Sequence, residues 1–115
     1  MSGIGDHALY AGSKAAVEAF TRSFSVDAGP KHITVNAIAP GGVKTDMYTE
    51  NSWHYVPGGY PGMPMETIDQ GLANFSPLKR VGLPRDVSRV VAWLAGEESE
   101  WVNGQVLLLT GGSIT

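Results

Sequence analysis

Apolar residues recur every three or four positions in the first part of the chain. Leu9, Ala16, Val17, Phe20 and Phe24 follow this spacing, which is the period of an amphipathic helix. The stretch runs into a glycine followed by a proline at positions 29 and 30, a combination that ends helices. The pattern therefore predicts a helix over residues 7–28. Its many alanines and its glycine would allow a second helix to approach closely.

Two later segments lack this period and are almost continuously apolar. Residues 33–39 precede Pro40-Gly41-Gly42, and residues 105–110 precede Gly111-Gly112. Apolar runs of this length, rich in β-branched residues, are typical of strands that are buried on both faces, as in parallel sheets covered by helices. We expect both segments to be buried strands.

The remaining segments complete an alternating order of elements. Residues 43–83 are rich in proline and glycine, which predicts a long binding lobe, with short helices near residues 45–53 and 65–75. Pro84 and the apolar spacing after it predict a helix over residues 84–96. The order helix, strand, lobe, helix, strand predicts one α/β domain over residues 1–115 with two parallel strands and flanking helices.

Composition and charge exclude several classes of protein and site. The chain is 43% hydrophobic and 17% charged, which is typical of a globular domain. Its net charge is −3 and its basic residues are scattered, so we expect no nucleic-acid or membrane partner. It has no cysteine, and its three histidines show no metal-binding spacing, so no metal is expected. The first residues lack the pattern of a secretion signal, and we expect a cytoplasmic protein.

Tyr10 and Lys14 are the first candidates for chemistry. They lie four residues apart, so both side chains project from one face of the predicted helix. A lysine charge close to a phenol favours the phenolate, and the positive end of a helix acts in the same direction. Pairs with this spacing are also common on solvated helix faces. Spacing alone therefore leaves both interpretations open.

The Tyr10 and Lys14 pair is part of a longer pattern that resembles the short-chain dehydrogenase/reductase family. The matching segments are residues 10–17, 33–41, 76–87 and 104–112, in the order that the family shows. The resemblance spans nearly the whole chain and corresponds to the carboxy-terminal half of a family member. Residues 40–47 and 54–57 look most similar to the fungal polyhydroxynaphthalene and versicolorin reductases.

This resemblance implies a fold, a reaction and a cofactor. The fold would be the carboxy-terminal portion of a Rossmann-like doubly wound parallel sheet. The reaction would be NAD(P)H-dependent reduction of a ketone or of a polyhydroxy-aromatic or polyketide substrate, with NADP(H) as the cofactor. Tyr10 would be the general acid/base, and Lys14 would hold the nicotinamide ribose.

The resemblance also implies residues for the cofactor and the substrate. Those that would line the nicotinamide or bond its carboxamide or a phosphate are Pro40, Gly41, Gly42, Val43 and Thr45. Those that would contact a flat phenolic ring are Gly42, Met47, Tyr55 and Phe75. The family leads us to expect tryptophan at the position of Phe75, and core packing is the alternative role for such an aromatic. We expect Trp53, Trp93 and Trp101 to pack in the interior.

Complete family members have parts for which residues 1–9 offer no counterpart. These parts are a strand, a glycine-rich turn and a helix that hold the pyrophosphate, and a catalytic serine upstream of the tyrosine. We therefore expect this chain alone to be an incomplete reductase. Cofactor-free proton transfer on a polyketide, as an isomerase, dehydratase or cyclase, is one alternative, and a non-catalytic oligomerising module is another. An uncovered apolar strand edge and a small-residue helix face predict a homo-oligomer.

Overall fold

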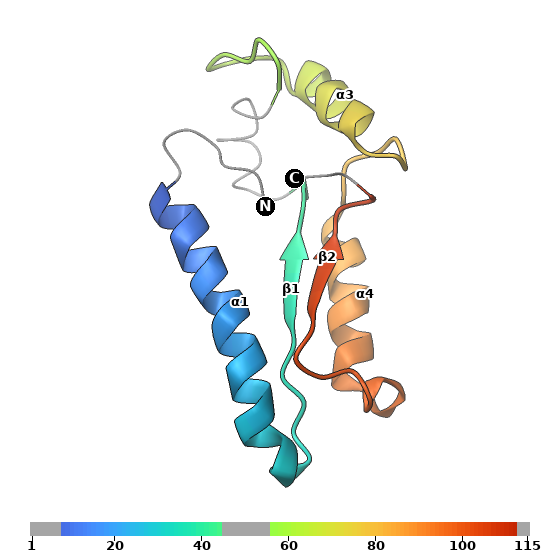
Figure 1. Cartoon of the computed structure of the whole chain (residues 1–115). Coiled ribbons are helices and arrows are strands. Elements are labelled where there is room, and N and C mark those ends of the chain that lie inside the picture. Colours follow the sequence, from blue (N-terminus) through green and yellow to red (C-terminus); the bar gives the residue numbers. More distant parts are fainter. Residues whose placement is uncertain (1–7, 45–55, 113–115) are drawn as a thin grey trace. The chain divides into compact units, whose positions relative to one another are not determined.

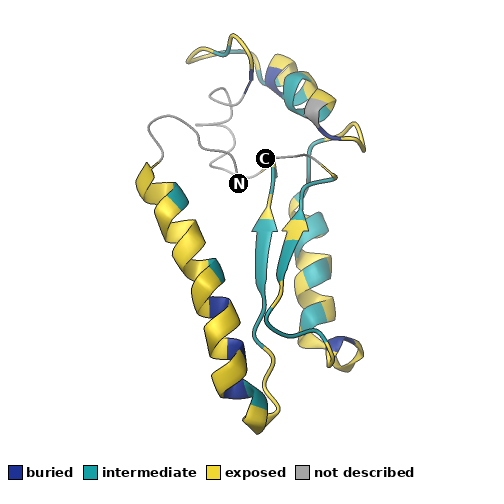
Figure 2. Ribbon diagram, in the orientation of Figure 1, coloured by how far each residue is buried: buried dark blue, intermediate teal, exposed yellow. Residues whose placement is uncertain are grey.

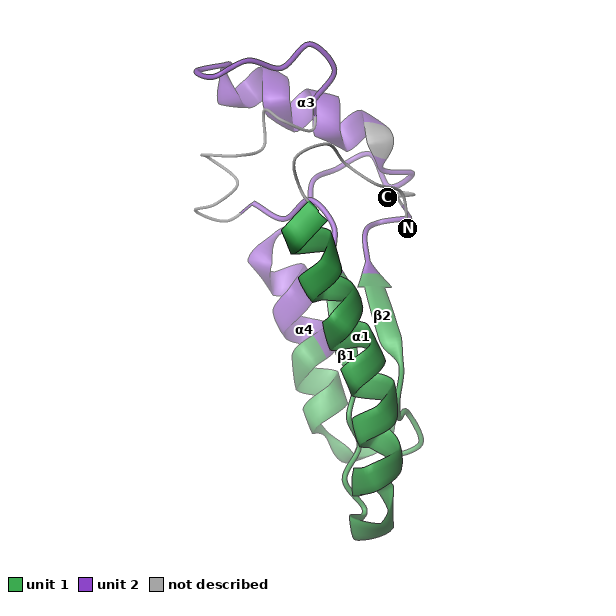
Figure 3. Ribbon diagram, turned by 60° about the vertical axis from the view of Figure 1, so that its left-hand side comes forward, with its two compact units in different colours: residues 1–39, 91–108, 115 green, residues 40–90, 109–114 purple. Residues whose placement is uncertain are grey.

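The computed structural model describes residues 8–44 and 56–112 (Figure 1). The elements in chain order are α1 (Ala8–Ala28), a 3₁₀ turn (Gly29–Lys31), β1 (Ala37–Pro40), α3 (Met65–Phe75), α4 (Pro84–Ala95), a second 3₁₀ turn (Glu97–Ser99) and β2 (Val106–Leu109). Residues 1–39, 91–108 and 115 form one compact unit, unit 1, and residues 40–90 and 109–114 form unit 2 (Figure 3).

The strands form a two-stranded parallel sheet. The Ala37 N–H donates to the carbonyl oxygen of Gln105 over 2.9 Å, and the Gly41 N–H donates to that of Leu109 over 2.8 Å. Equal four-residue steps in the same direction on both strands define a parallel register. The predicted α/β class with two parallel strands is therefore confirmed.

The described helices lie where the sequence predicts them, whereas the strands are shorter. The short helix predicted near residues 45–53 lies outside the described residues. β1 covers Ala37–Pro40 instead of residues 33–39, and β2 covers Val106–Leu109 instead of residues 105–110. The residues before β1 are held by side-chain amides and by one main-chain bond, from the Gly104 N–H to the Val35 carbonyl oxygen over 2.8 Å. The Asn103 Oδ1 accepts from the Val35 N–H over 2.9 Å, and the Asn36 Oδ1 accepts from the Gln105 N–H over 3.0 Å.

Unit 1 holds α1 against the turn before β2. The Asn103 Nδ2 donates to the Ser25 carbonyl oxygen over 3.4 Å, and the Asn36 Nδ2 donates to that of Val102 over 3.0 Å. Gly104 adopts a φ of 69°, and a Cβ at this position would lie 2.7 Å from the Ser25 Oγ. Glycine is therefore required here both by its backbone conformation and by the close approach of α1.

The prediction that residues 33–39 form a strand buried on both faces is wrong, and so is the prediction that residues 105–110 form a buried strand. Residues 35–39 are half-buried, and Leu108 in β2 is 71% exposed (Figure 2). In the part of the chain that the structure describes, the sheet has two strands, so each strand borders on only one neighbour. The predicted packing of two tryptophans is also wrong, because Trp101 is 97% and Trp93 41% exposed. Trp53 lies outside the described residues.

Unit 2 has a small apolar core of its own. Ile68 of α3 is 2% exposed and packs with Val56. The half-buried side chains around them are Met63, Met65, Leu72 and Val81. A Cβ on Gly71 would lie 2.8 Å from a Val56 methyl carbon, so α3 needs glycine at this contact. The core therefore fixes α3 within unit 2.

Asp86 organises the start of α4. Its carboxylate accepts a hydrogen bond from the Leu83 N–H over 2.7 Å, which satisfies a donor at the helix end. Pro84 occupies the first helical position, where its missing N–H costs nothing. Within the described ranges, none of the helices combines the length and the apolarity that a membrane crossing requires.

Candidate active site

Tyr10 and Lys14 lie in the first turns of α1, within unit 1. The Lys14 Nζ is 5.5 Å from the centroid of the Tyr10 ring, within the range of a cation–π contact. The Ser13 Oγ donates to the Tyr10 carbonyl oxygen over 2.8 Å. Tyr10 is 56% exposed. The structure thus brings together the phenol and the ammonium as the sequence predicts.

Residues 40–43, from the last residue of β1 onwards, form a main-chain frame that belongs to unit 2. The Gly41 N–H donates a hydrogen bond to the Leu109 carbonyl oxygen. The Gly42 carbonyl oxygen accepts one from the Gly82 N–H over 2.8 Å. Val43 pairs with Gly82 as an isolated parallel bridge. The frame lies at the carboxyl end of a parallel strand, where sheets of this type bind ligands.

The two glycines of this frame differ in the space around them. A Cβ on Gly41 would lie 3.3 Å from Thr110, which is a tight contact, whereas a Cβ on Gly42 would meet no atom of the described residues within 4 Å. The free space beside Gly42 allows a flat ring to approach the backbone closely. The nicotinamide role of residues 40–43 stays a prediction.

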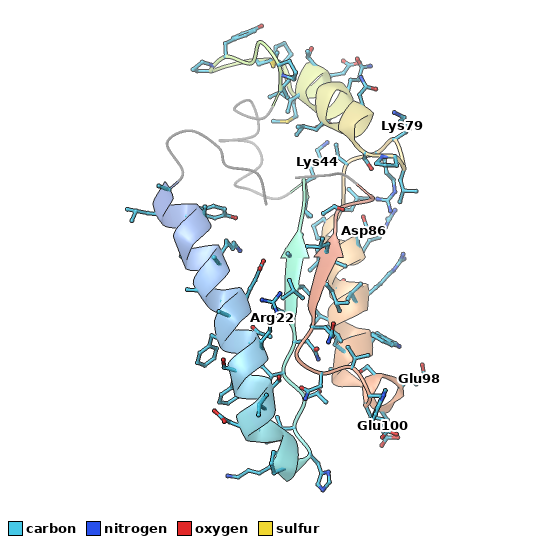
Figure 4. The ribbon with its side chains drawn as sticks, viewed as in Figure 1. Arg22, Lys44, Lys79, Asp86, Glu98 and Glu100 are labelled. Carbon is cyan, nitrogen blue, oxygen red and sulfur yellow. The ribbon has the colours of Figure 1, made fainter. Side chains whose placement is uncertain are left out.

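An ion pair connects the segment after this frame to α3. The Lys44 Nζ lies 2.8 Å from the Asp69 Oδ2; Lys44 is labelled in Figure 4. The two residues are 25 positions apart, and the sequence pattern did not single out either of them. Both line a groove of about 290 Å³, together with Gln70, Ala73, Val81 and Leu83.

Arg80 and Asp86 form a second ion pair in unit 2. The Arg80 Nη1 and Nη2 donate to the two Asp86 oxygens over 2.7 and 2.9 Å. These bonds, together with the bond from the Leu83 N–H, hold the pKa of Asp86 well below its usual range. The same carboxylate raises the pKa of Arg80. The ion pair therefore holds the segment between residue 80 and the start of α4. This segment contains Gly82, whose N–H is bonded to the Gly42 carbonyl oxygen.

The other predicted site residues are not described at the level of their side chains. Thr45, Met47 and Tyr55 lie outside the described residues, and Phe75 is the last residue of α3. Their roles therefore stay predictions. In the described ranges, no three or more His, Asp or Glu side chains gather as metal ligands would.

Comparison with known proteins places the chain in a family. Residues 1–113 match the family model described as enoyl-(acyl carrier protein) reductase, a branch of the short-chain dehydrogenases. The chain belongs to the short-chain dehydrogenase/reductase family. The family that the residues resembled is therefore confirmed over nearly the full length of the chain.

Two fungal short-chain dehydrogenase/reductases are similar to all or nearly all of the chain. A hydroxynaphthalene reductase-like protein of Metarhizium acridum is 77% identical over 115 residues, which are 100% of this chain and 43% of that protein. A tetrahydroxynaphthalene reductase of Pestalotiopsis fici is 62% identical over 99% of this chain and 41% of its own length. The chain thus spans less than half the length of these relatives.

Solved structures of short-chain dehydrogenase/reductases share the fold. A family member from Francisella tularensis superposes with a TM-score of 0.83 at 25% identity, over 96% of this chain and 45% of its own. A 3-oxoacyl-[acyl-carrier protein] reductase with bound NAD from Brucella melitensis gives 0.71 at 30% identity, over 94% and 34%. The Rossmann-type fold expected from the resemblance is therefore confirmed for the part that this chain represents.

Proposed function

We propose that this chain supplies the proton-transfer and substrate-binding part of an NADPH-dependent reductase that acts on hydroxynaphthalene-type aromatic substrates. The observation that carries the proposal is the Tyr10 and Lys14 pair on the exposed start of α1. The 77% identity to a hydroxynaphthalene reductase-like protein supports the substrate class.

Tyr10 acts as the general acid in this reaction. Its phenol donates a proton to the carbonyl oxygen of the substrate, and the new O–H bond completes an alcohol. The hydride that reduces the carbonyl carbon would come from the nicotinamide cofactor when it is bound. The Lys14 ammonium, 5.5 Å from the Tyr10 ring, stabilises negative charge on the phenolate that remains and binds the ribose hydroxyls.

Residues 40–43 are suited to hold the nicotinamide ring of NADP(H). Their main chain is fixed by Leu109 and Gly82, and the space beside Gly42 is open. Thr45 follows in the chain, and we assign it a hydrogen bond to the carboxamide or to a phosphate. Titration with NADPH and NADH in parallel would show which nicotinamide cofactor is preferred.

Substrate contacts are assigned to Gly42, Met47, Tyr55 and Phe75. An aromatic side chain stacked on a naphthalene ring contributes about 0.5–1.5 kcal/mol beyond simple burial. The position of Phe75 at the end of α3, in the same unit as Gly42, is compatible with this role. We further assign the chain to a homo-oligomer, because Val17 and Phe20 of α1 are 54% and 64% exposed.

A chimaeric enzyme tests the proposal. The matching 115 residues of the Metarhizium acridum relative would be replaced by this chain, and NADPH oxidation would be followed with a hydroxynaphthalene substrate. The proposal predicts turnover by the chimaera, with the unmodified relative as the control. A chimaera that folds and binds NADPH but reduces no hydroxynaphthalene would contradict it.

A further inference from the structure

Lys44 and Asp69 connect two parts of unit 2 that have different tasks in the proposed reaction. Lys44 directly follows residues 40–43, which are assigned to the nicotinamide, and Asp69 lies in α3, which ends at Phe75. We infer that their ion pair is a positioning device that holds α3 at the distance from the cofactor segment that the aromatic substrate needs. The inference rests on the proposed function and adds a determinant of substrate affinity.

Both ends of the ion pair start from anchored positions. The Lys44 N–H donates to the Gly82 carbonyl oxygen over 2.9 Å, and the Gly82 N–H donates to that of Gly42 over 2.8 Å. On α3, Asp69 is next to Ile68, which is 2% exposed in the core of unit 2. The 2.8 Å contact between Lys44 and Asp69 therefore joins two fixed points and not two mobile loops.

The ion pair adds a polar contact to the apolar packing of α3. Val81 packs against the core formed by Ile68 and Val56. Lys44 and Asp69 line a groove of about 290 Å³ together with Ala73, Val81 and Leu83. Their contact therefore restrains α3 at this groove in addition to the core.

The size of the effect follows from the exposure of the two side chains. They are 47% and 30% exposed, and exposed ion pairs change an equilibrium by about two- to fivefold at most. If the pair biases α3 towards a substrate-competent position, its loss lowers the competent fraction and raises the apparent KM by the same factor. The proton transfer from Tyr10 is unaffected, so kcat should not change.

Three variants of the chimaera separate positioning from a general effect of charge. Asp69→Asn removes the ion pair, Lys44→Arg keeps it, and Glu66→Gln removes an exposed carboxylate from the first turn of the same helix. We expect Asp69→Asn to raise the KM for the hydroxynaphthalene about two- to fivefold, with kcat and the KM for NADPH unchanged. Lys44→Arg and Glu66→Gln should behave like the parent.

Two outcomes in the kinetic test would overturn the inference. One is an equal rise in KM for Glu66→Gln and Asp69→Asn, and the other is a lower kcat for Asp69→Asn at unchanged KM. If Asp69→Asn does not fold, the exchanged pair, Lys44→Asp with Asp69→Lys, replaces it. A near-parental KM for the exchanged pair supports positioning, and a KM that stays raised contradicts it.

Hydrogen exchange separates a failure of this inference from a failure of the proposed function. It is measured on the folded chimaera and needs no turnover. Asp69→Asn should speed the exchange of the α3 amides, and Glu66→Gln should not. An inactive parent chimaera would refute the proposed function and leave this readout intact. Unchanged exchange in Asp69→Asn would refute the ion pair as a restraint on α3.

Discussion

Asn36 and Asn103 show how single side chains replace strand pairing in unit 1. The Asn36 amide accepts from the Gln105 N–H and donates to the Val102 carbonyl oxygen. The Asn103 amide accepts from the Val35 N–H and donates to the Ser25 carbonyl oxygen. Each amide thus satisfies main-chain groups that a longer ladder would otherwise pair, and Asn103 also holds α1 in place.

Replacing Asn36 by alanine should destabilise the fold. The substitution removes the partner of the half-buried Val102 carbonyl oxygen and that of the exposed Gln105 N–H, and leaving a buried group without a partner costs about 1–3 kcal/mol. The free energy of unfolding of the chimaera, measured by urea denaturation, should fall by at least about 1 kcal/mol. Asn74→Ala is the matched control, because Asn74 is exposed on α3 and its recorded bond uses its main-chain oxygen. Equal stabilities for the two variants would contradict this role of Asn36.

At the residue scale, the sequence predicted contacts between residues that are close along the chain better than contacts between residues that are far apart in it. Tyr10 and Lys14 are four positions apart on one helix, so their proximity follows from helical geometry. The Asn36 amide bonds to main-chain groups 66 and 69 positions away, and Lys44 meets Asp69 across 25 positions. These contacts depend on how the chain folds back on itself, which the periodicity of a single sequence does not encode.

At the scale of the elements, the sequence predicted the ends of the helices better than the ends of the strands. The bounds of α1 and α4 match the predicted ranges to within one residue at each end. Helix ends are set by nearby residues, such as Gly29 and Pro30 after α1 and Pro84 at the start of α4. The strands are shorter than predicted because the length of a strand depends on the neighbour with which it pairs.

The stability of α4 and its preceding loop should depend on acid pH through Asp86. Its pKa is lowered in the folded state by the hydrogen bonds from Arg80 and Leu83. The stabilisation is therefore fully present above the unfolded value of about 4 and is lost as the pH falls below it. The unfolding midpoint of the parent should exceed that of Asp86→Asn at neutral pH, and the difference should shrink below about pH 4.

A pair of arginine variants checks the cause of this pH dependence. Arg80→Gln removes the hydrogen bonds that lower the pKa of Asp86 most, whereas Arg85→Gln removes a charge that contributes least. Arg80→Gln should therefore weaken the pH dependence of the unfolding midpoint more than Arg85→Gln does. Equal effects of the two variants would show that general positive charge, and not the paired geometry, controls Asp86.

At the scale of the whole molecule, unit 1 exposes apolar side chains that we expect a complete reductase to bury. Ile33 and Leu108 are 51% and 71% exposed, and a groove of about 300 Å³ lies between β1 and α4. The residues that line this groove are Thr34, Asn36, Ile38, Val91, Leu94 and Ala95. Because the curated relatives are more than twice as long as the matched region, we assign this surface to contacts with the remainder of such a protein.

The 115-residue chain should therefore bind NADPH weakly or not at all when it is studied alone. The Rossmann fold holds the pyrophosphate on a glycine-rich turn and a helix N-terminus, and this proposal assigns that site to the remainder of the reductase. Fluorescence titration with NADPH should show binding when the remaining part of the Metarhizium acridum relative is added. Tight binding by the chain alone would contradict this division of tasks.

Turnover by the chimaera with and without the Tyr10 phenol tests the central claim most directly. Positioned acid/base groups contribute about 10²–10⁴ to a rate, so Tyr10→Phe should lower kcat by at least about 100-fold while NADPH binding remains. Tyr60→Phe removes the same hydroxyl from another tyrosine, which is 51% exposed in unit 2, and should leave kcat unchanged. A Tyr10→Phe chimaera that reduces hydroxynaphthalene as fast as its parent would contradict the assignment of Tyr10 as the proton donor.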